Sequence, residues 1–334
     1  MKGSQQIVPI SAEILTQAKK SELSKVSEKM LPRFKKGLIP VILAAGLTPA
    51  WQQILSFRRF IPGEVNRAQQ AVWCGSGKVL NVGCALHHLG VKSKTLCLAG
   101  GIAGEQICAD FQKMTIPVRW VKSRIPTRVC TTILDETTKT TTELVENSNS
   151  IPPEELDLFL DAFVEESASV QVVVLSGSLP AGAPPDFYRR MLEKTSAKAV
   201  LDVRGPELKA ALQMRPYVVK PNREELARTV GRDLASEQDL VAAMSELRDQ
   251  GAEWVVVSHG SGPLMALGPD GLIRIEIPII DVCNPIGCGD CLAAGIAAGI
   301  DRQWTMHESL NLGVRAAAEN ARVLLPARNL SRLP

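Results

Sequence analysis

Short, almost wholly apolar runs alternate with longer stretches of helical periodicity from residue 39 onward. An apolar run of about four to eight residues is typical of a strand that is buried on both faces of a sheet. The predicted strands are residues 41–45, 95–99, 170–176, 198–203, 217–220 and 254–258. The predicted helices are residues 80–89, 153–166, 185–194, 223–230 and 237–250. This alternation predicts an α/β fold with a mostly parallel central sheet that is flanked by helices.

Two regions break the alternation, because they look like strands without helices between them. They span about residues 54–73 and 117–146. In the second region, two β-rich runs at 127–134 and 139–144 flank residues 135–138, which have the composition of a hairpin turn. We therefore predict a small second sheet beside the main one.

The first 37 residues differ from the rest in charge, since they hold eight Lys/Arg and three Glu. Ser11 can cap a helix, and Pro32 ends it. The apolar residues at roughly helical spacing are Leu15, Leu23, Val26 and Met30. A mitochondrial leader would be rich in Arg and poor in acids, whereas this segment has one Arg. We therefore predict a basic helical extension over residues 1–37 that packs on the body or on a partner.

Composition limits the class of protein. The whole chain has 334 residues, 45% of them hydrophobic, and a net charge of +3, while the part after residue 37 carries 30 Lys/Arg and 32 Asp/Glu. Such a balance does not favour nucleic acid as a partner. The longest charge-free runs, such as residues 292–300, are far shorter than the roughly 20 residues of a membrane span. We read no secretory signal, and eight scattered cysteines in a long chain favour reduced thiols and a cytoplasmic protein.

The most informative motif is N-P-I-G-C-G-D-C-L-A-A-G at residues 284–295. It follows strand-like runs at 273–277 and 279–282 and precedes a helix rich in Ala and Gly. The two glycines allow a tight turn, so that the N–H groups of Gly287, Cys288 and Gly289 would point outward at the helix N-terminus. Such an end binds anions.

Asp290 falls in the first turn of that helix. It can be an ordinary acid that complements the helix dipole, or it can accept a proton from a hydroxyl while the amides stabilise developing negative charge. The same stretch contains a C-x-x-C between Cys288 and Cys291. Without a second such pair or a nearby His, it does not indicate a redox or zinc site.

Lys78 follows two glycines and opens a helix, as in the end of a phosphate-binding P-loop. The P-loop pattern fails, because Val72 stands where its first Gly belongs and Val79 where its Ser or Thr belongs. Lys78 is therefore either a solvated first-turn lysine or a cation for a phosphate.

Further polar groups lie where predicted strands end. In the K-P-N-R-E-E stretch at 220–225, Asn222 and Glu225 share a helix face, either as a capping box or as holders of a hydrated Mg²⁺; both can be true. Glycine-rich strand ends also occur at 176–182 and 258–262, where we expect His259 to make only a local contact. Such ends would line one edge of a parallel sheet, where ligands collect.

Together these stretches resemble the PfkB/ribokinase family of carbohydrate kinases, from about residue 39 to the end. Within it they are most similar to the branch of 1-phosphofructokinases and tagatose-6-phosphate kinases. The motifs that carry the resemblance are P-G-E-V-N-R at 62–67, S-G-K-V-L-N-V-G at 76–83, A-G-G-I-A-G at 99–104, T-R at 127–128, S-G-S-L-P-A-G at 176–182, K-P-N-R-E-E at 220–225 and P-I-G-C-G-D at 285–290.

The resemblance implies a ribokinase-like kinase domain over residues 38–334, whose small sheet is a lid, with a homodimer through the lid as a further expectation. Asp290 would be the base that takes the proton from the sugar hydroxyl. The amides of Gly287, Cys288 and Gly289 would form an anion hole that holds the γ-phosphoryl group of ATP. Asn222 and Glu225 would position Mg²⁺ through water. The nucleotide would be bordered by Lys220, Ser258 and Gly260, and the sugar and its phosphate by Gln52, Gly77, Lys78, Asn81, Arg128 and Ser178.

The sequence departs from the branch chiefly on the sugar side. Gln52 stands where the branch has an Asp that binds sugar hydroxyls, Ser76 and Val79 replace two glycines, and Asn284 and Pro285 precede the anion hole. We expect an ATP-dependent kinase that transfers the γ-phosphoryl to a hydroxyl of a phosphorylated ketohexose, fructose 1-phosphate or tagatose 6-phosphate first. The alternatives are a kinase for another sugar or a nucleoside, or a non-catalytic sugar-phosphate-binding protein on the same fold.

Overall fold

The computed structural model describes residues 42–330 and residue 333. The predicted helical extension at 1–37 lies outside the described residues. No helix in the described ranges is long and apolar enough to span a membrane. All eight cysteines fall within these ranges and are free thiols.

A sheet of nine strands forms the centre of the body, in the order β13-β12-β11-β10-β9-β8-β1-β4-β5. Its strands are β1 (Ile42–Gly46), β4 (Ser93–Ala99), β5 (Val118–Lys122), β8 (Val172–Ser176), β9 (Lys198–Asp202), β10 (Val218–Val219), β11 (Trp254–His259), β12 (Gly262–Gly268) and β13 (Gly271–Ile275). Only the pairs that involve β12 and β13 at one end, β11 with β12 and β12 with β13, are antiparallel. The predicted mostly parallel α/β sheet is confirmed.

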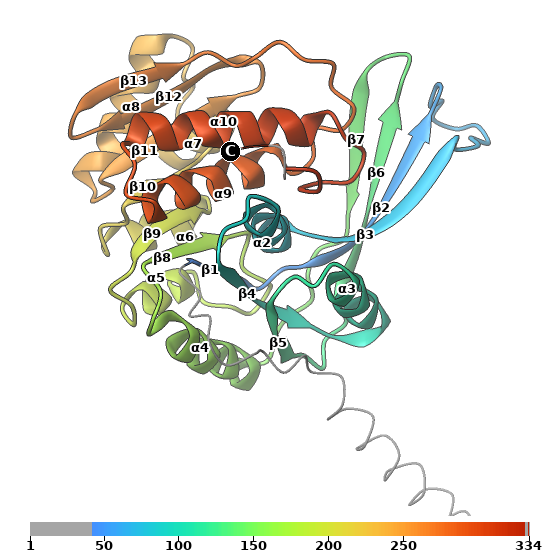
Figure 1. Ribbon diagram of the computed structural model, residues 1–334, viewed down its shortest axis with the longest axis horizontal. Helices are drawn as coiled ribbons and strands as arrows, with labels where there is room; N and C mark the ends of the chain where they lie inside the picture. The colour runs from blue at the N-terminus through green and yellow to red at the C-terminus, as the bar shows by residue number, and fades with distance from the viewer. Residues whose placement is uncertain (1–41, 331–332, 334) are drawn as a thin grey trace, which may run out of the picture. The chain divides into compact units, whose positions relative to one another are not determined.

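Helices cover both faces of this sheet (Figure 1). They are α2 (Lys78–His88), α3 (Gly101–Lys113), α4 (Pro153–Ser167), α5 (Phe187–Leu192), α6 (Gly205–Leu212), α7 (Arg223–Val230), α8 (Glu237–Asp249), α9 (Cys288–Asp301) and α10 (Met306–Ala321). Ile42 and Ala44 of β1 pack with α2, α9 and α10, whereas Leu43 and Ala45 pack with α4 to α8. This alternation is that of a strand buried on both faces.

The helix that begins at the glycine motif packs very closely on its neighbour. A methyl group at Gly295 of α9 would lie 2.5 Å from the Cα of Gly313 in α10, and one at Gly299 would clash with Ser309. The Ala and Gly content of α9 thus lets two helices approach closely enough to fix the N-terminus of α9 at the sheet edge.

A second sheet of four strands stands beside the large one (Figure 1), in the order β3-β2-β6-β7. Its strands are β2 (Ala50–Phe57), β3 (Gln70–Ser76), β6 (Arg128–Asp135) and β7 (Thr140–Val145). The central pair is parallel and the outer pairs are antiparallel. The predicted hairpin turn is closed by Asp135, whose Oδ1 accepts the N–H groups of Thr137 and Thr138 at 2.9 Å each.

Several predicted boundaries were wrong. The region 117–146 was assigned whole to the small sheet, but β5 is the edge strand of the large one. Residues 279–282 are not a strand, and the exposed side chain of Ile279 follows Pro278, which cannot donate to a ladder. The pattern also missed α3, whose start holds glycines at 100, 101 and 104, as well as α6, α10 and β12, whereas the predicted run at 273–277 overlaps β13.

Candidate active site

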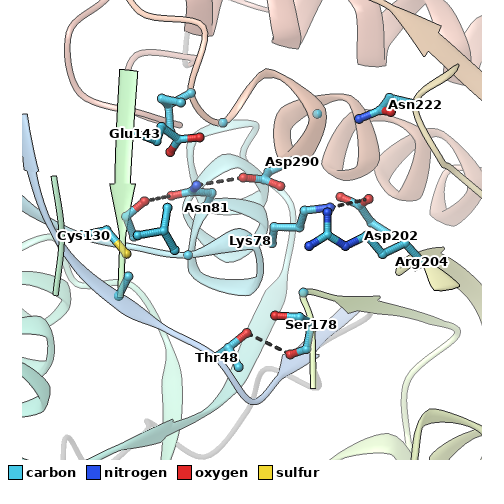
Figure 2. Close-up of a pocket in the computed structure, with 18 of the residues that line it drawn as sticks. Thr48, Lys78, Asn81, Cys130, Glu143, Ser178, Asp202, Arg204, Asn222 and Asp290 are labelled. Atoms are coloured by element: carbon cyan, nitrogen blue, oxygen red, sulfur yellow. Dashed lines mark hydrogen bonds and ion pairs between the residues drawn. The ribbon is translucent and has the colours of Figure 1, made fainter. Parts of the chain in front are cut away.

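A cavity of about 550 Å³ lies where the strand ends of the large sheet face the small sheet. The strand-end residues on its wall include Thr48, Ser178, Asp202, Lys220 and Ser258. The small sheet contributes Ala50 and Gln52 of β2, Arg128 and Cys130 of β6, and Glu143 and Val145 of β7. Figure 2 shows these two sides with the N-terminus of α9 between them. The structure brings every residue predicted for the site to this wall except Cys288.

The N-terminus of α9 has the form expected of an anion cradle. Gly287 caps it with a φ of 86°, which favours glycine. The first-turn amides of Gly289 and Asp290 have no acceptor within the helix, and both residues line the cavity. Cys288 differs from the prediction, because its amide donates to the Pro285 carbonyl at 3.2 Å and its thiol donates to the Ala317 carbonyl in α10 at 3.4 Å.

Two wholly buried asparagines hold the glycine turn from behind, and the motif-based prediction missed both roles. Asn284 accepts the Ile286 N–H at 3.0 Å and donates to the Leu324 carbonyl at 2.8 Å. Asn320 donates to the Ile286 carbonyl at 2.8 Å and accepts the Ala327 N–H. The segment after α10 therefore fixes the turn that carries the cradle.

Asp290 is buried and lies beside this cradle. Its Oδ2 accepts a hydrogen bond from Asn81 Nδ2 at 2.7 Å, and Asn81 Oδ1 accepts one from Ser76 Oγ at 3.1 Å. Burial and the negative charge of Asp202 raise the pKa of Asp290 to about 6. Lys78, Asn81 and Lys220 oppose this shift. A carboxylate with a pKa near neutrality is suited to accept a proton.

Asp202 is an acid that the motif search missed. It ends β9, its side chain is 2% exposed, and its Oδ1 lies 3.0 Å from Lys78 Nζ and 3.3 Å from Lys220 Nζ. Burial works against its charge, but Lys220 and Lys78 outweigh burial and lower the pKa of Asp202. Its other oxygen, Oδ2, is buried without a hydrogen-bond partner among the described residues.

The Lys78 ammonium forms ion pairs with two carboxylates. Besides Asp202, its ammonium lies 3.7 Å from Glu225 Oε1. Burial disfavours the charge, but Asp202, Glu225 and Asp290 outweigh it and raise the pKa of Lys78. The two cations expected on the sugar phosphate thus differ in surroundings, because within residues 42–330 the Arg128 guanidinium donates to the carbonyls of Thr48, Pro49 and Glu146, each at 3.4 Å, and forms no ion pair.

Asn222 and Glu225 form the predicted capping box of α7. Asn222 Oδ1 accepts the Glu225 N–H at 2.8 Å, and Glu225 Oε2 accepts the Asn222 N–H at 3.0 Å. Glu225 Oε1 lies 3.7 Å from Lys78 Nζ and 3.9 Å from Arg204 Nη1, and both Glu225 and Asp202 line the cavity. No cluster of three or more His, Cys, Asp or Glu stands ready for a metal within residues 42–330. These donors fit a hydrated Mg²⁺, which binds through few carboxylates and keeps water.

Gln52 lies on the small-sheet side of the cavity and is 4% exposed. Its Nε2 donates to Thr132 Oγ1 at 2.8 Å and, at 3.3 Å, to the Gln53 carbonyl. The carboxylate of Glu143, which the motif search did not select, also faces the cavity from this side (Figure 2).

A family model described as pfkB family carbohydrate kinase matches residues 50–329. The chain belongs to this family. It is an enzyme that transfers a phosphoryl group to an alcohol. The 1-phosphofructokinase of Bacillus subtilis (strain 168) is 29% identical over 284 residues, which cover 84% of this chain and 92% of the relative.

Two solved structures share the fold of this pfkB kinase. Phosphofructokinase-2 from Escherichia coli in complex with fructose-6-phosphate superposes with a TM-score of 0.79 at 23% identity, over 89% of this chain and 98% of that one. Arabidopsis thaliana ribokinase complexed with ribose and ATP gives a TM-score of 0.67 at 17% identity, over 89% and 99%. These likenesses confirm the ribokinase-like fold with its small second sheet.

The pfkB kinase has a second cavity of about 460 Å³ next to the first. The two share Ser258, Gly260, Pro285 and Gly289. Its remaining wall is mostly apolar and includes Leu264, Ile277, Ile279, Val282, Leu292 and Val314. The cradle at the start of α9 thus separates a charged cavity from an apolar one.

Proposed function

We propose that the protein is an ATP-dependent kinase that transfers the γ-phosphoryl group to a hydroxyl of a phosphorylated ketohexose. Fructose 1-phosphate and tagatose 6-phosphate are the first substrates to test. The observation that carries the proposal is Asp290, a buried carboxylate with a pKa of about 6 next to open first-turn amides of α9. Phosphoryl transfer needs positioning and charge neutralisation, and this arrangement supplies both.

In this proposal Asp290 takes the proton of the attacking hydroxyl, whose oxygen forms the new P–O bond as the bond from the γ-phosphorus to ADP breaks. The amides of Gly289 and Asp290 stabilise the negative charge on the transferring group. Lys78 lies between Asp202 and the catalytic carboxylate of Asp290, so its positive charge also stabilises the transferring phosphoryl group. Asn222, Glu225 and Asp202 would hold Mg²⁺, which neutralises and orients the phosphates.

The apolar cavity suits the purine ring of ATP. A purine is flat and apolar on its faces, and Ile279 and Val282 expose their side chains on this wall. Lys220, Ser258 and Gly260 line the charged cavity between this wall and Asp290, where the phosphates of ATP would lie. The ribokinase that shares this fold was solved with ATP.

A phosphorylated sugar is supported by Arg128 and by the relatives. Arg128 faces the cavity with no carboxylate partner among the described ion pairs, so its guanidinium can bind a phosphate. The relative from Bacillus subtilis is a 1-phosphofructokinase. Gly77, Asn81 and Ser178 would complete the sugar site with Arg128.

The small sheet would act as the lid that excludes water from the reaction. Its outer face carries Trp51 stacked on Trp73, with ring centroids 5.7 Å apart, and Trp73 and Leu144 are about half exposed. This apolar face suits a homodimer through the lid. A cytoplasmic enzyme with reduced thiols completes the proposal.

The proposal is tested by screening ATP consumption with Mg²⁺ over sugars, sugar phosphates and nucleosides. We expect turnover with a phosphorylated ketohexose and little with the unphosphorylated sugar. Turnover confined to a nucleoside or to a neutral sugar would contradict the proposed substrate class. Tight binding of a sugar phosphate without ADP formation would instead indicate a non-catalytic binding protein.

A further inference from the structure

Glu143 sits on the cavity face of the small sheet, in a row that crosses three strands. It lies directly opposite Thr132 in the β6–β7 ladder, and Thr132 Oγ1 accepts the hydrogen bond from Gln52 of β2. Facing side chains in such a ladder point to the same side of the sheet. Glu143 and Gln52 therefore flank Thr132 on the face that lines the cavity.

Among the carboxylates of the cavity, Glu143 alone lacks a partner in the described part of the chain. Asp202 pairs with two lysines, Glu225 caps α7, and Asp290 accepts a hydrogen bond from Asn81. No hydrogen bond or ion pair to the Glu143 carboxylate is formed within residues 42–330. A carboxylate that faces a binding cavity with all its acceptor sites open is suited to groups that donate hydrogen bonds.

The surroundings decide which ligand group this acceptor fits. Arg128 on β6 is set back from Thr132 by four residues, about 13 Å of strand at roughly 3.3 Å per residue. The Arg128 side chain reaches back to the Glu146 carbonyl, and its charge acts on the Glu143 carboxylate, so one sugar phosphate can place its phosphate at Arg128 and its hydroxyls at Glu143. The carboxylate repels a phosphate at its own position, so it favours hydroxyl groups there.

Gln52 offers a weaker acceptor than Glu143 does. Its amide nitrogen is already committed to Thr132 and to the Gln53 carbonyl, and its neutral carboxamide is a weaker acceptor than a carboxylate. The Glu143 side chain is exposed at the cavity, where partial desolvation raises its pKa and the positive charge of Arg128 opposes this shift. Hydrogen bonds from hydroxyl groups would stabilise the ionised form in the same way.

We propose that Glu143 binds hydroxyl groups of the sugar substrate and selects among sugar phosphates by their arrangement. This inference rests on the proposed function and deepens it. Glu143 on β7 would bind the hydroxyl groups of the substrate, because Gln52 replaces the acid that has this role in the related branch. Arg128 would bind the phosphate of the substrate.

The test is Glu143→Gln, with Glu64→Gln as the matched control because Glu64 is an exposed acid of the loop between β2 and β3, outside the cavity. We expect Glu143→Gln to raise the KM for the sugar phosphate roughly 10- to 100-fold, the usual scale for a lost charged hydrogen bond. The KM for ATP should change less than about twofold. The control should match wild type in both.

Monodeoxy analogues of the accepted sugar phosphate give a second readout that does not depend on how well the variant folds. Wild type should lose affinity for the analogue that lacks the bound hydroxyl, and Glu143→Gln should bind this analogue and its parent equally. An unchanged sugar KM in Glu143→Gln, or equal losses for sugar and ATP, would overturn the inference alone. Absence of phosphoryl transfer to any sugar phosphate by wild type would overturn the proposed function as well.

Discussion

The two sides of the cavity differ in how their charges are balanced. On the edge of the large sheet, Lys78 and Lys220 share one oxygen of Asp202, and Glu225 closes a capping box. On the small sheet, in the described part of the chain, Arg128 donates to carbonyls without an ion pair and Glu143 has no hydrogen-bond or ion-pair partner. Charges that are already paired and held in place suit catalysis of a single reaction. Donors and acceptors without partners suit recognition of a substrate. We therefore assign the chemistry to the large sheet and the selection of the substrate to the small one.

The largest effect is expected at the base on the large-sheet side. Asp290→Asn should lower kcat roughly 10²- to 10⁴-fold, since it removes the proton acceptor. Sugar affinity, measured by calorimetry without nucleotide, should stay within a few-fold of wild type. A variant that loses sugar binding but keeps kcat would reverse the assignment of the two sides.

The second-largest effect is expected for Asp202, the counter-ion of two lysines. Asp202→Asn would leave Lys220, whose side chain is 4% exposed, without its buried counter-ion. We expect a loss of roughly 3 kcal/mol in the free energy of unfolding, toward the low end for a broken buried pair because Lys78 is 38% exposed. Urea denaturation measures this loss, with Asp161→Asn on the exposed face of α4 as the control. Equal stability of the two variants would show that the lysines do not need Asp202.

A third prediction uses the raised pKa of Asp290. The unfolded chain loses this proton near pH 3.8 and the folded chain near pH 6, so ionisation costs wild type stability as pH rises between these values. Asp290→Asn has no carboxyl group at this position, so it does not lose this stability as pH rises. Its gain in unfolding free energy over wild type should grow from near zero at pH 4 to about 1–3 kcal/mol at pH 7. A gain that shrinks as pH rises would mean that the folded protein favours the ionised carboxylate.

The smallest effect is expected for a residue of the motif that faces away from the charged cavity. Cys288 donates its thiol proton to the Ala317 carbonyl and accepts from Asn320 Nδ2 at 3.3 Å, and a serine hydroxyl can do both. We therefore expect Cys288→Ser to keep kcat within about threefold of wild type. A loss on the scale of Asp290→Asn would place the sulfur among the reacting groups.

Local signals predicted one side of the cavity better than the other. Asp290 follows a glycine, Asn222 follows a proline and Glu225 comes three residues after Asn222, all at helix starts, so short motifs identify them without knowledge of the fold. The parallel alternation also predicts that strand ends meet at one edge. Where prolines and glycines interrupt the pattern, as at Pro278 and at the start of α3, the boundaries were wrong.

The remaining site residues depend on contacts between distant parts of the chain. Asp202 meets Lys78 across 124 residues of sequence, and Asn81 meets Asp290 across 209. Glu143 reaches the cavity only through the register of β7 with β6. An isolated acid on a polar strand carries no local signal that distinguishes a binding group from an exposed one.

The most direct test of the central claim is phosphorus NMR of ATP with fructose 1-phosphate or tagatose 6-phosphate and Mg²⁺, run with wild type and with Asp290→Asn. The account predicts that wild type forms ADP and a sugar bisphosphate in equal amounts, and that the variant forms them at least 100-fold more slowly. ADP that forms without a bisphosphate, or equal rates in the two proteins, would contradict it.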